Sequence, residues 1–206
     1  MKNVLYWAAA GLLAASCDAP RSATEQADPA VRSEAVRGAA AAPVSFRREL
    51  TEGDFRFELQ TTGAGTQRQL QLRVERNGRE LATTTQAVSG TVTDAVAANL
   101  NDDKYPELLV FVADAGSGSY GQLLGYEFLN QGRRNLMLPE LSAAAAQGYQ
   151  GHDEFRVDGQ QVLRTFPVYR AADANCCPSG GRRTVRYVLP SGLATFREAG
   201  MSTAAR

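Results

Sequence analysis

The sequence contains little of what most catalytic sites and metal centres use. It has 206 residues but one histidine, His152, and three cysteines. A Ser-His-Asp triad or a multi-histidine zinc site would have at most this one histidine. The G-x-S-x-G motif of serine hydrolases is also absent from the sequence. We therefore expect a protein that is not an enzyme and holds no cofactor, with His152 as a structural residue beside carboxylates.

The sequence also lacks an excess of charge of either sign. The 22 basic residues equal the 22 acidic ones, and lysine occurs only as Lys2 and Lys104. Binding of nucleic acid depends on a basic surface, so the composition argues against a nucleic-acid partner. With 44% hydrophobic residues, the chain has enough apolar material for one globular domain.

No apolar run is long enough to span a membrane comfortably, and the longest one lies at the N-terminus. Lys2 precedes an apolar stretch at residues 4–15, which has the length of a signal peptide. Small residues then precede Cys17, which resembles a bacterial lipobox, although Ala14 stands where that motif usually has leucine. The sequence predicts a signal peptide at 1–16, a lipid on Cys17 and a membrane-anchored protein in the periplasm; a plain secreted protein is the alternative.

Residues 17–45 are rich in alanine, serine, proline and scattered charges. Such a composition cannot bury enough apolar surface to offset the loss of chain entropy. We expect a flexible tether there, a β domain at residues 46–200 and a disordered tail at 201–206.

Two of the cysteines, Cys176 and Cys177, are adjacent in the sequence. Adjacent Cα atoms lie about 3.8 Å apart, whereas disulfides usually join Cα atoms roughly 4.4–6.8 Å apart. Export would expose the pair to an oxidising compartment. A vicinal disulfide and two unpaired thiols before Pro178 both fit the sequence.

The domain has the period of β-strands. Phe55, Phe57 and Leu59 alternate with polar residues, and similar segments follow at hairpin spacing. This pattern predicts an all-β antiparallel sandwich of short strands with one short helix at residues 139–147. We expect strands at residues 55–60, 70–75, 79–87, 92–98, 108–112, 122–129, 154–157, 161–166, 184–189 and 193–197.

Residues 99–128 form the centre of this pattern. An Asn/Asp-rich turn leads into the apolar run 108–112, which predicts a strand buried on both faces. The glycine loop 116–121 follows and predicts the tip of a hairpin. Its glycines match the dinucleotide fingerprint, but that fingerprint requires a helix directly afterwards, and a strand is expected here.

The Asn/Asp-rich turn also resembles a calcium loop. Asn99, Asn101, Asp103 and Glu107 fall at positions 1, 3, 5 and 9, where calcium loops place oxygen ligands. Two departures oppose this interpretation. Lys104 stands at the usual glycine, and Val110 stands at the usual bidentate glutamate of an EF-hand. The sequence therefore favours a structural Asx turn with no metal, and calcium is the alternative.

Five stretches, in the same order, resemble the periplasmic inhibitors of invertebrate-type (I-type) lysozyme. The resemblance extends over about residues 46–198, and the vicinal cysteines depart from it. The stretches are residues 99–108, 117–121, 148–153, 163–169 and 178–181.

The resemblance implies that Ser117, Gly118, Ser119 and Tyr120, which match the family's Ser-Gly-x-Tyr motif, bind I-type lysozyme. The loop would enter the active-site cleft and protect the cell wall. Members of the family can pair into dimers, so the resemblance also allows a homodimer. A calcium- or carbohydrate-binding surface lipoprotein is the alternative function.

Overall fold

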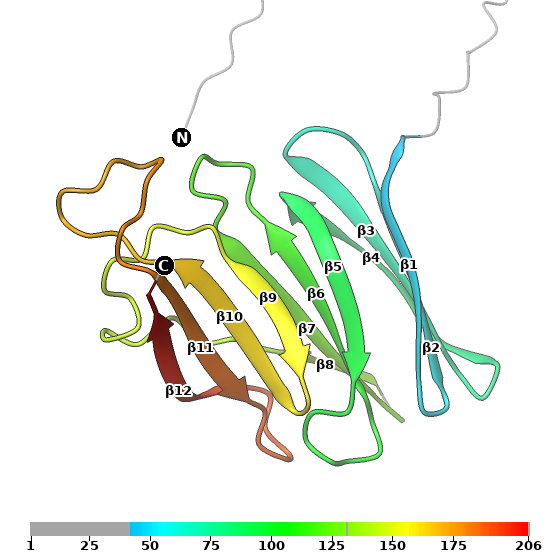
Figure 1. Cartoon of the computed structure of the whole chain (residues 1–206). Coiled ribbons are helices and arrows are strands. Elements are labelled where there is room, and N and C mark those ends of the chain that lie inside the picture. The colour runs from blue at the N-terminus through cyan, green and yellow to red at the C-terminus, as the bar shows by residue number, and fades with distance from the viewer. Residues whose placement is uncertain (1–41, 131, 206) are drawn as a thin grey trace, which may run out of the picture. The chain divides into compact units, whose positions relative to one another are not determined.

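A computed structural model describes residues 42–130 and 132–205 (Figure 1). Within these residues the protein is all-β and antiparallel, as the sequence predicts, with twelve strands and no helix. No helix of the described chain has the length and apolar character that a membrane crossing requires. The predicted signal peptide, Cys17 and nearly all of the predicted tether lie outside the described residues.

The strands form three sheets, and each sheet consists of four strands that are consecutive in the chain. The first sheet contains β1 (Val44–Glu52), β2 (Phe55–Thr62), β3 (Gln67–Arg76) and β4 (Arg79–Ser89). The central sheet contains β5 (Thr91–Ala98), β6 (Glu107–Ala113), β7 (Gly121–Leu129) and β8 (Gly132–Leu136). The third sheet contains β9 (Glu154–Asp158), β10 (Gln161–Pro167), β11 (Arg182–Val188) and β12 (Arg197–Ala204).

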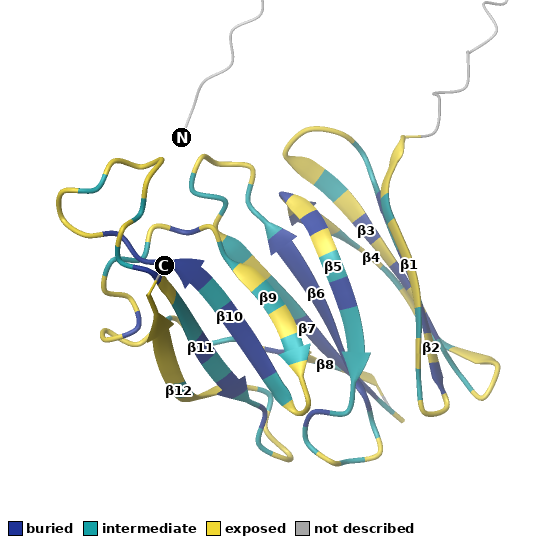
Figure 2. Cartoon of the chain, in the orientation of Figure 1, coloured by how far each residue is buried: buried dark blue, intermediate teal, exposed yellow. Residues whose placement is uncertain are grey.

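The sandwich has three layers, because the central sheet packs against another sheet on each face (Figure 1). One core joins it to the first sheet and contains Phe57, Leu72 and Val110. The other core joins it to the third sheet and contains Leu109 and Phe166. Burial is accordingly deepest along the middle of the molecule (Figure 2).

Strand β6 shows why the run of residues 108–112 is apolar at every position. Leu108, Val110 and Val112 belong to the core with the first sheet, whereas Leu109 and Phe111 belong to the core with the third sheet. All five are at most 2% exposed. Alternate residues of a strand point to opposite faces, so the predicted strand with two buried faces is confirmed.

The predicted helix at residues 139–147 is wrong. The segment forms turns, with one helical hydrogen bond, from Ala146 N to Ser142 O. Arg183 Nη1 donates instead to the carbonyl oxygens of Ala145 (2.9 Å) and Gln147 (2.6 Å). One helical hydrogen bond does not offset the conformational entropy lost when a helix nucleates, so the alanines do not propagate a helix.

Three boundaries also differ from the predictions. Strand β1 begins at Val44, before the expected domain start at residue 46. The expected strand at residues 193–197 is mostly irregular, with one isolated bridge from Thr195 to Met137, and β12 begins only at Arg197. The expected disordered tail is wrong for residues 201–204, which pair with β11 up to the contact of Ala204 with Arg182.

Candidate functional site

The glycine loop joins β6 to β7 and forms the tip of their hairpin, as predicted. Asp114 N donates to Tyr120 O (3.0 Å) at the base of the loop, and Ser119 N donates to Gly116 O (2.9 Å) within it. Ser119 has a φ of 41°, in the left-handed region. These bonds give the loop a compact turn that carries residues 117–120 beyond the sheet (Figure 1).

Two hydroxyl groups of the loop are open to a partner. Ser117 is exposed, and Tyr120 is 47% exposed, a high value for a large aromatic side chain. Neither hydroxyl forms a hydrogen bond with any residue that the structure describes. Both can donate to an acceptor on another molecule.

A second loop, at residues 148–153, supports the first. His152 N donates to Gly118 O (2.7 Å), and Gly121 N donates to Asp153 Oδ2 (2.7 Å). The ring of Tyr120 meets the ring of Tyr149 edge to face, with 5.6 Å between centroids. The exposed tip is therefore held from beneath at three points.

A buried polar triangle anchors this support. Asp153, whose side chain is fully buried, accepts hydrogen bonds from Tyr149 Oη (2.5 Å) and Arg164 Nε (2.7 Å). Arg164 Nη2 also donates to Tyr149 Oη (2.6 Å), which closes the triangle. Burial, followed by the hydrogen bond to Asp153, raises the pKa of the Tyr149 hydroxyl well above its ordinary value. The phenol stays protonated and continues to donate.

Two glycines are required where the loops approach each other. A Cβ on Gly118 would stand 2.5 Å from Tyr120 Cε2, inside the space of the ring. Gly151 has a φ of +90°, and a Cβ there would stand 2.1 Å from Gly118 O. A side chain at either position would push the two loops apart.

Sequence reasoning placed the loop but assigned no role to the triangle. Tyr149, Asp153 and Arg164 lie inside stretches that carry the family resemblance, yet nothing in their spacing shows that they meet. The available signal was Arg164, a charged residue in a strand that also contains Val162, Leu163 and Phe166. A charge at such a position predicts a buried partner.

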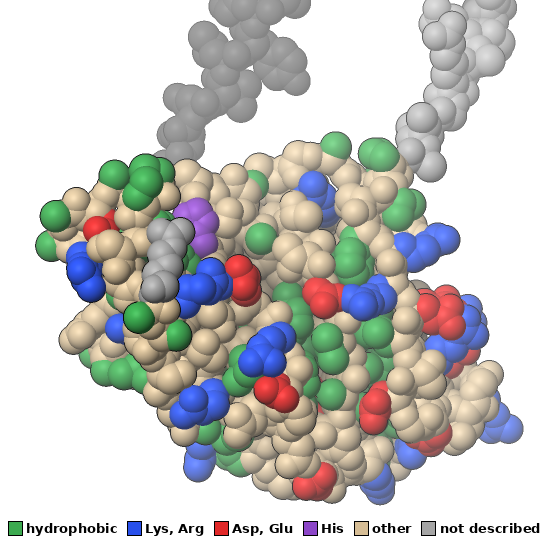
Figure 3. Space-filling view, viewed as in Figure 1, with side chains coloured by type: hydrophobic (Ala, Val, Ile, Leu, Met, Phe, Trp, Pro, Cys, Tyr) green, Lys and Arg blue, Asp and Glu red, His purple; other side chains and the backbone are tan. Residues whose placement is uncertain are grey.

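His152 helps to support the glycine loop through its backbone amide. It is exposed, adopts a φ of 58°, and its ring forms no hydrogen bond within the described chain. In Figure 3 the ring of this single histidine (purple) lies at the surface. It borders a hollow of about 400 Å³ together with Tyr169, Arg182 and Cys176. The structure joins Cys176 to Cys177 in a vicinal disulfide.

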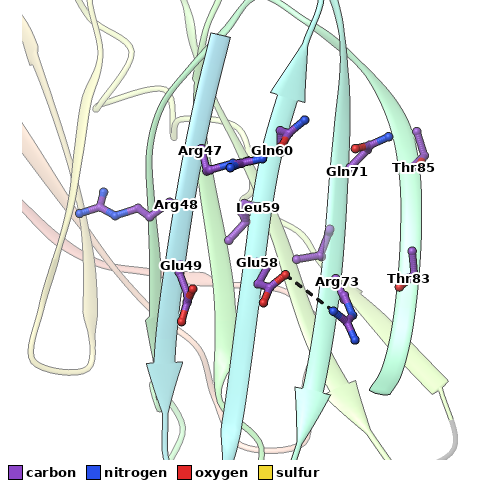
Figure 4. A pocket seen from close by; sticks show the side chains of 11 residues that line it. Arg47, Arg48, Glu49, Glu58, Leu59, Gln60, Gln71, Arg73, Thr83 and Thr85 are labelled. Carbon is purple, nitrogen blue, oxygen red and sulfur yellow. Dashed lines mark hydrogen bonds and ion pairs between the residues drawn. The ribbon is translucent and has the colours of Figure 1, made fainter. Parts of the chain in front are cut away.

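A larger hollow, of about 510 Å³, lies on the exposed face of the first sheet (Figure 4). Most of its charged side chains already have partners, among them Arg48, which pairs with Asp94 of β5. Arg73, for example, contacts Glu75 (2.8 Å) and Glu80 (2.9 Å). Acidic and basic side chains are also interspersed over the side of the molecule that Figure 3 shows. Because most of its charges are paired and Arg47 bonds Gln60, we assign no site to this hollow.

The predicted calcium-loop residues lie at the other end of β6. Asn99 Nδ2 donates to Asp103 O (2.6 Å), and Asn101 Oδ1 accepts from Asp103 N (3.0 Å), as expected of an Asx turn. Glu107 begins β6 and accepts from Leu100 N (2.7 Å). Its side chain is fully buried.

The sequence did not indicate a second buried glutamate beside this turn. Glu127, on β7, is the direct cross-strand partner of Glu107 and is also fully buried. Arg134, on β8, forms an ion pair with Glu127 Oε2. Carboxylate oxygens of Asp103, Glu107 and Glu127 lie within 4.8 Å of one another. We call these three residues the carboxylate row.

Burial raises the pKa of Glu107 to about 7; the bond from Leu100 N opposes this shift, and the charges of Glu127 and Asp103 add to it. Burial also raises the pKa of Glu127, against the opposing effect of Arg134. Like charges directly opposite each other on a sheet are destabilising. Ionisation of more than one carboxylate of the row is therefore destabilising.

Compared with models of protein families, with curated proteins and with solved structures, the chain matches none.

Proposed function

We propose that the protein inhibits a lysozyme of the invertebrate type by inserting the loop of Ser117, Gly118, Ser119 and Tyr120 into the active-site cleft. The observation that carries this proposal is the pair of unbonded hydroxyls on a protruding tip that is braced from beneath. The Ser-Gly-x-Tyr resemblance supplies the class of target.

The chemistry of the target suits such a tip. A retaining glycosidase works with two carboxyl groups about 5–5.5 Å apart. The hydroxyls of Ser117 and Tyr120 can donate to those oxygens, and a hydrogen bond to a charged group contributes roughly 1.5–3 kcal/mol. The triangle beneath the loop fixes its conformation before binding, which lowers the entropy cost of association.

The predicted lipid on Cys17 would also determine where the protein acts. A lipid on Cys17 would hold the domain at a membrane in the periplasm, where it would meet a lysozyme that attacks the cell wall. The protein would then act by occupation of another enzyme's cleft and would catalyse no reaction.

The test is an inhibition assay of the purified protein against invertebrate-, chicken- and goose-type lysozymes. We expect inhibition of the invertebrate type, competitive with peptidoglycan. Tyr120→Phe keeps the ring contact with Tyr149 and removes the hydroxyl, so it isolates the hydrogen bond. Tyr120→Phe and Ser117→Ala should each weaken inhibition by on the order of 10- to 100-fold.

Ser191→Ala is the matched control, because Ser191 is an exposed serine in the turn between β11 and β12. It should inhibit like the wild type. Wild-type inhibition by the Ser117→Ala/Tyr120→Phe double variant would refute the loop mechanism. If the folded wild type inhibits none of the three lysozymes, the proposed function itself is wrong.

A further inference from the structure

We propose that the carboxylate row binds a calcium ion at the base of the β6–β7 hairpin, with Asp103, Glu107 and Glu127 as ligands. This site is separate from the loop that we propose for lysozyme. Unpaired buried oxygens, the net charge of the row and the spacing of its carboxylate oxygens all favour a bound cation.

Buried polar atoms without a partner gather at this one place. Among the described residues, six buried side-chain atoms have no hydrogen bond, and four of them belong to the row or to its turn. Three are acceptor oxygens, namely Glu107 Oε1, Glu127 Oε1 and Asn99 Oδ1. A buried acceptor without a donor is costly, and a cation would satisfy such oxygens together.

The charge of the row also requires a counterion. One guanidinium, that of Arg134, contacts the row, so the charge excess is two negative charges when all three carboxylates are ionised and one when Glu107 is protonated. Arg134 contacts the Oε2 atom of Glu127 and leaves Oε1 without a partner. A divalent cation would balance this excess.

Spacing and ligand type favour calcium. Ca²⁺ binds oxygen ligands at about 2.3–2.6 Å, so two ligands of one ion lie at most about 5.2 Å apart. The three carboxylate oxygens, within 4.8 Å of one another, fit that sphere. Because all three ligands are oxygens, the site suits a hard cation. Ca²⁺ tolerates irregular geometry, whereas Mg²⁺ demands a near-ideal octahedron.

The two sequence features that opposed calcium have a different meaning in the structure. Lys104 is exposed and its Nζ lies over the ring of Tyr105, 5.2 Å from the centroid. The left-handed residue of the turn is Asp102, with a φ of 57°, so no glycine is required at position 104. Glu127, from the neighbouring strand, replaces the glutamate that the loop lacks at Val110.

The site lies at one end of β6 and the lysozyme-binding loop at the other (Figure 1). Seven residues of strand separate them, or roughly 20 Å at about 3.3 Å per residue. Calcium would therefore stabilise the base of the hairpin without touching Ser117 or Tyr120. Failure of one proposal leaves the other standing.

The test is to strip the purified protein with EGTA and then to titrate it with CaCl₂, with MgCl₂ as a parallel arm. Calorimetric titration should show one calcium site. At calcium 100-fold above the Kd, Tm should rise by roughly 5–10 °C, and EGTA should reverse the rise. Magnesium should have a much smaller effect.

Glu107→Gln is the decisive variant, because glutamine keeps an oxygen to accept from Leu100 N and removes the charge. Without calcium its Tm should equal or exceed that of the wild type, since the repulsion is gone, and calcium should no longer raise it. Glu140→Gln changes an exposed glutamate and should keep the full calcium response. Asp103→Asn provides a second test, since it keeps an oxygen for Tyr105 N.

Absence of both heat and Tm shift with calcium in the wild type would overturn the proposal. An undiminished calcium response in Glu107→Gln and Asp103→Asn would overturn it as well, because the ion would then bind elsewhere.

Discussion

Removal of the Asp153 carboxylate tests whether the buried triangle holds both the domain and the loop. Asp153→Ala deletes the acceptor of three hydrogen bonds, from Gly121 N, Tyr149 Oη and Arg164 Nε. It also leaves Arg164, which is 8% exposed, without its counter-charge. Breaking a buried ion pair from one side typically costs about 3–5 kcal/mol of unfolding free energy.

For a domain of this size, each kcal/mol lowers Tm by roughly 2–4 °C, so the variant should melt roughly 6–20 °C below the wild type. The only tryptophan, Trp7, lies outside the described domain, so far-UV circular dichroism in a urea series is the suitable measurement. The midpoint should fall while the denaturant slope stays constant, because the surface exposed on unfolding is unchanged.

Asp158→Ala is the control, since Asp158 is 63% exposed and pairs with Arg156 at the surface. It should not change the midpoint measurably. In the Asp153→Ala/Arg164→Met double variant, part of the lost stability should return because the uncompensated charge is gone. If Asp153→Ala costs no more than Asp158→Ala, the triangle is not what stabilises this end of the molecule.

Three further outcomes are expected. Gly118→Ala should displace the Tyr120 ring and abolish inhibition while the protein stays folded by circular dichroism. Leu109→Ala should cost about 2–5 kcal/mol in a urea series, because Leu109 is fully buried between two sheets. A smaller loss would mean that the layers repack around the cavity. Cys176→Ser/Cys177→Ser should shift Tm by less than about 2 °C, because a bridge between neighbours closes almost no loop.

The parts of the fold that could be predicted are those in which a strand carries its own pattern. Phe55, Phe57 and Leu59 alternate with polar residues and form the buried face of β2. Asn77 and Gly78 both have positive φ, as the predicted tight hairpin requires. In these places the chain contains the whole signal locally.

Two edge strands that the sequence did not predict depend on their neighbours rather than on their own pattern. Strand β8 (Gly132–Leu136) has one buried residue, Leu136, and β12 has none. Both are edge strands held by backbone pairing to β7 and β11. Backbone hydrogen bonds leave no mark in side-chain periodicity, so a polar edge strand resembles a loop or a tail in the sequence.

The candidate site likewise has one part that is local in the sequence and two parts that depend on distant residues. The hairpin tip at residues 116–121 is a local feature, and the sequence located it. The support beneath it joins Asp153 to Gly121 across 32 residues. The carboxylate row likewise depends on the register that sets Glu127 opposite Glu107. Register emerges only when strands pair, so neither arrangement could be read from residue spacing.

The order of the sheets along the chain has a consequence for folding. Each sheet is one uninterrupted segment, so most strand pairs form between near neighbours in sequence, which favours rapid folding for an all-β protein. The central sheet, however, is apolar on both faces. A chain that ended after β8 would leave Leu109, Phe111 and Leu136 without the third sheet that covers them. Premature termination at this point would yield an aggregating fragment rather than a smaller stable domain.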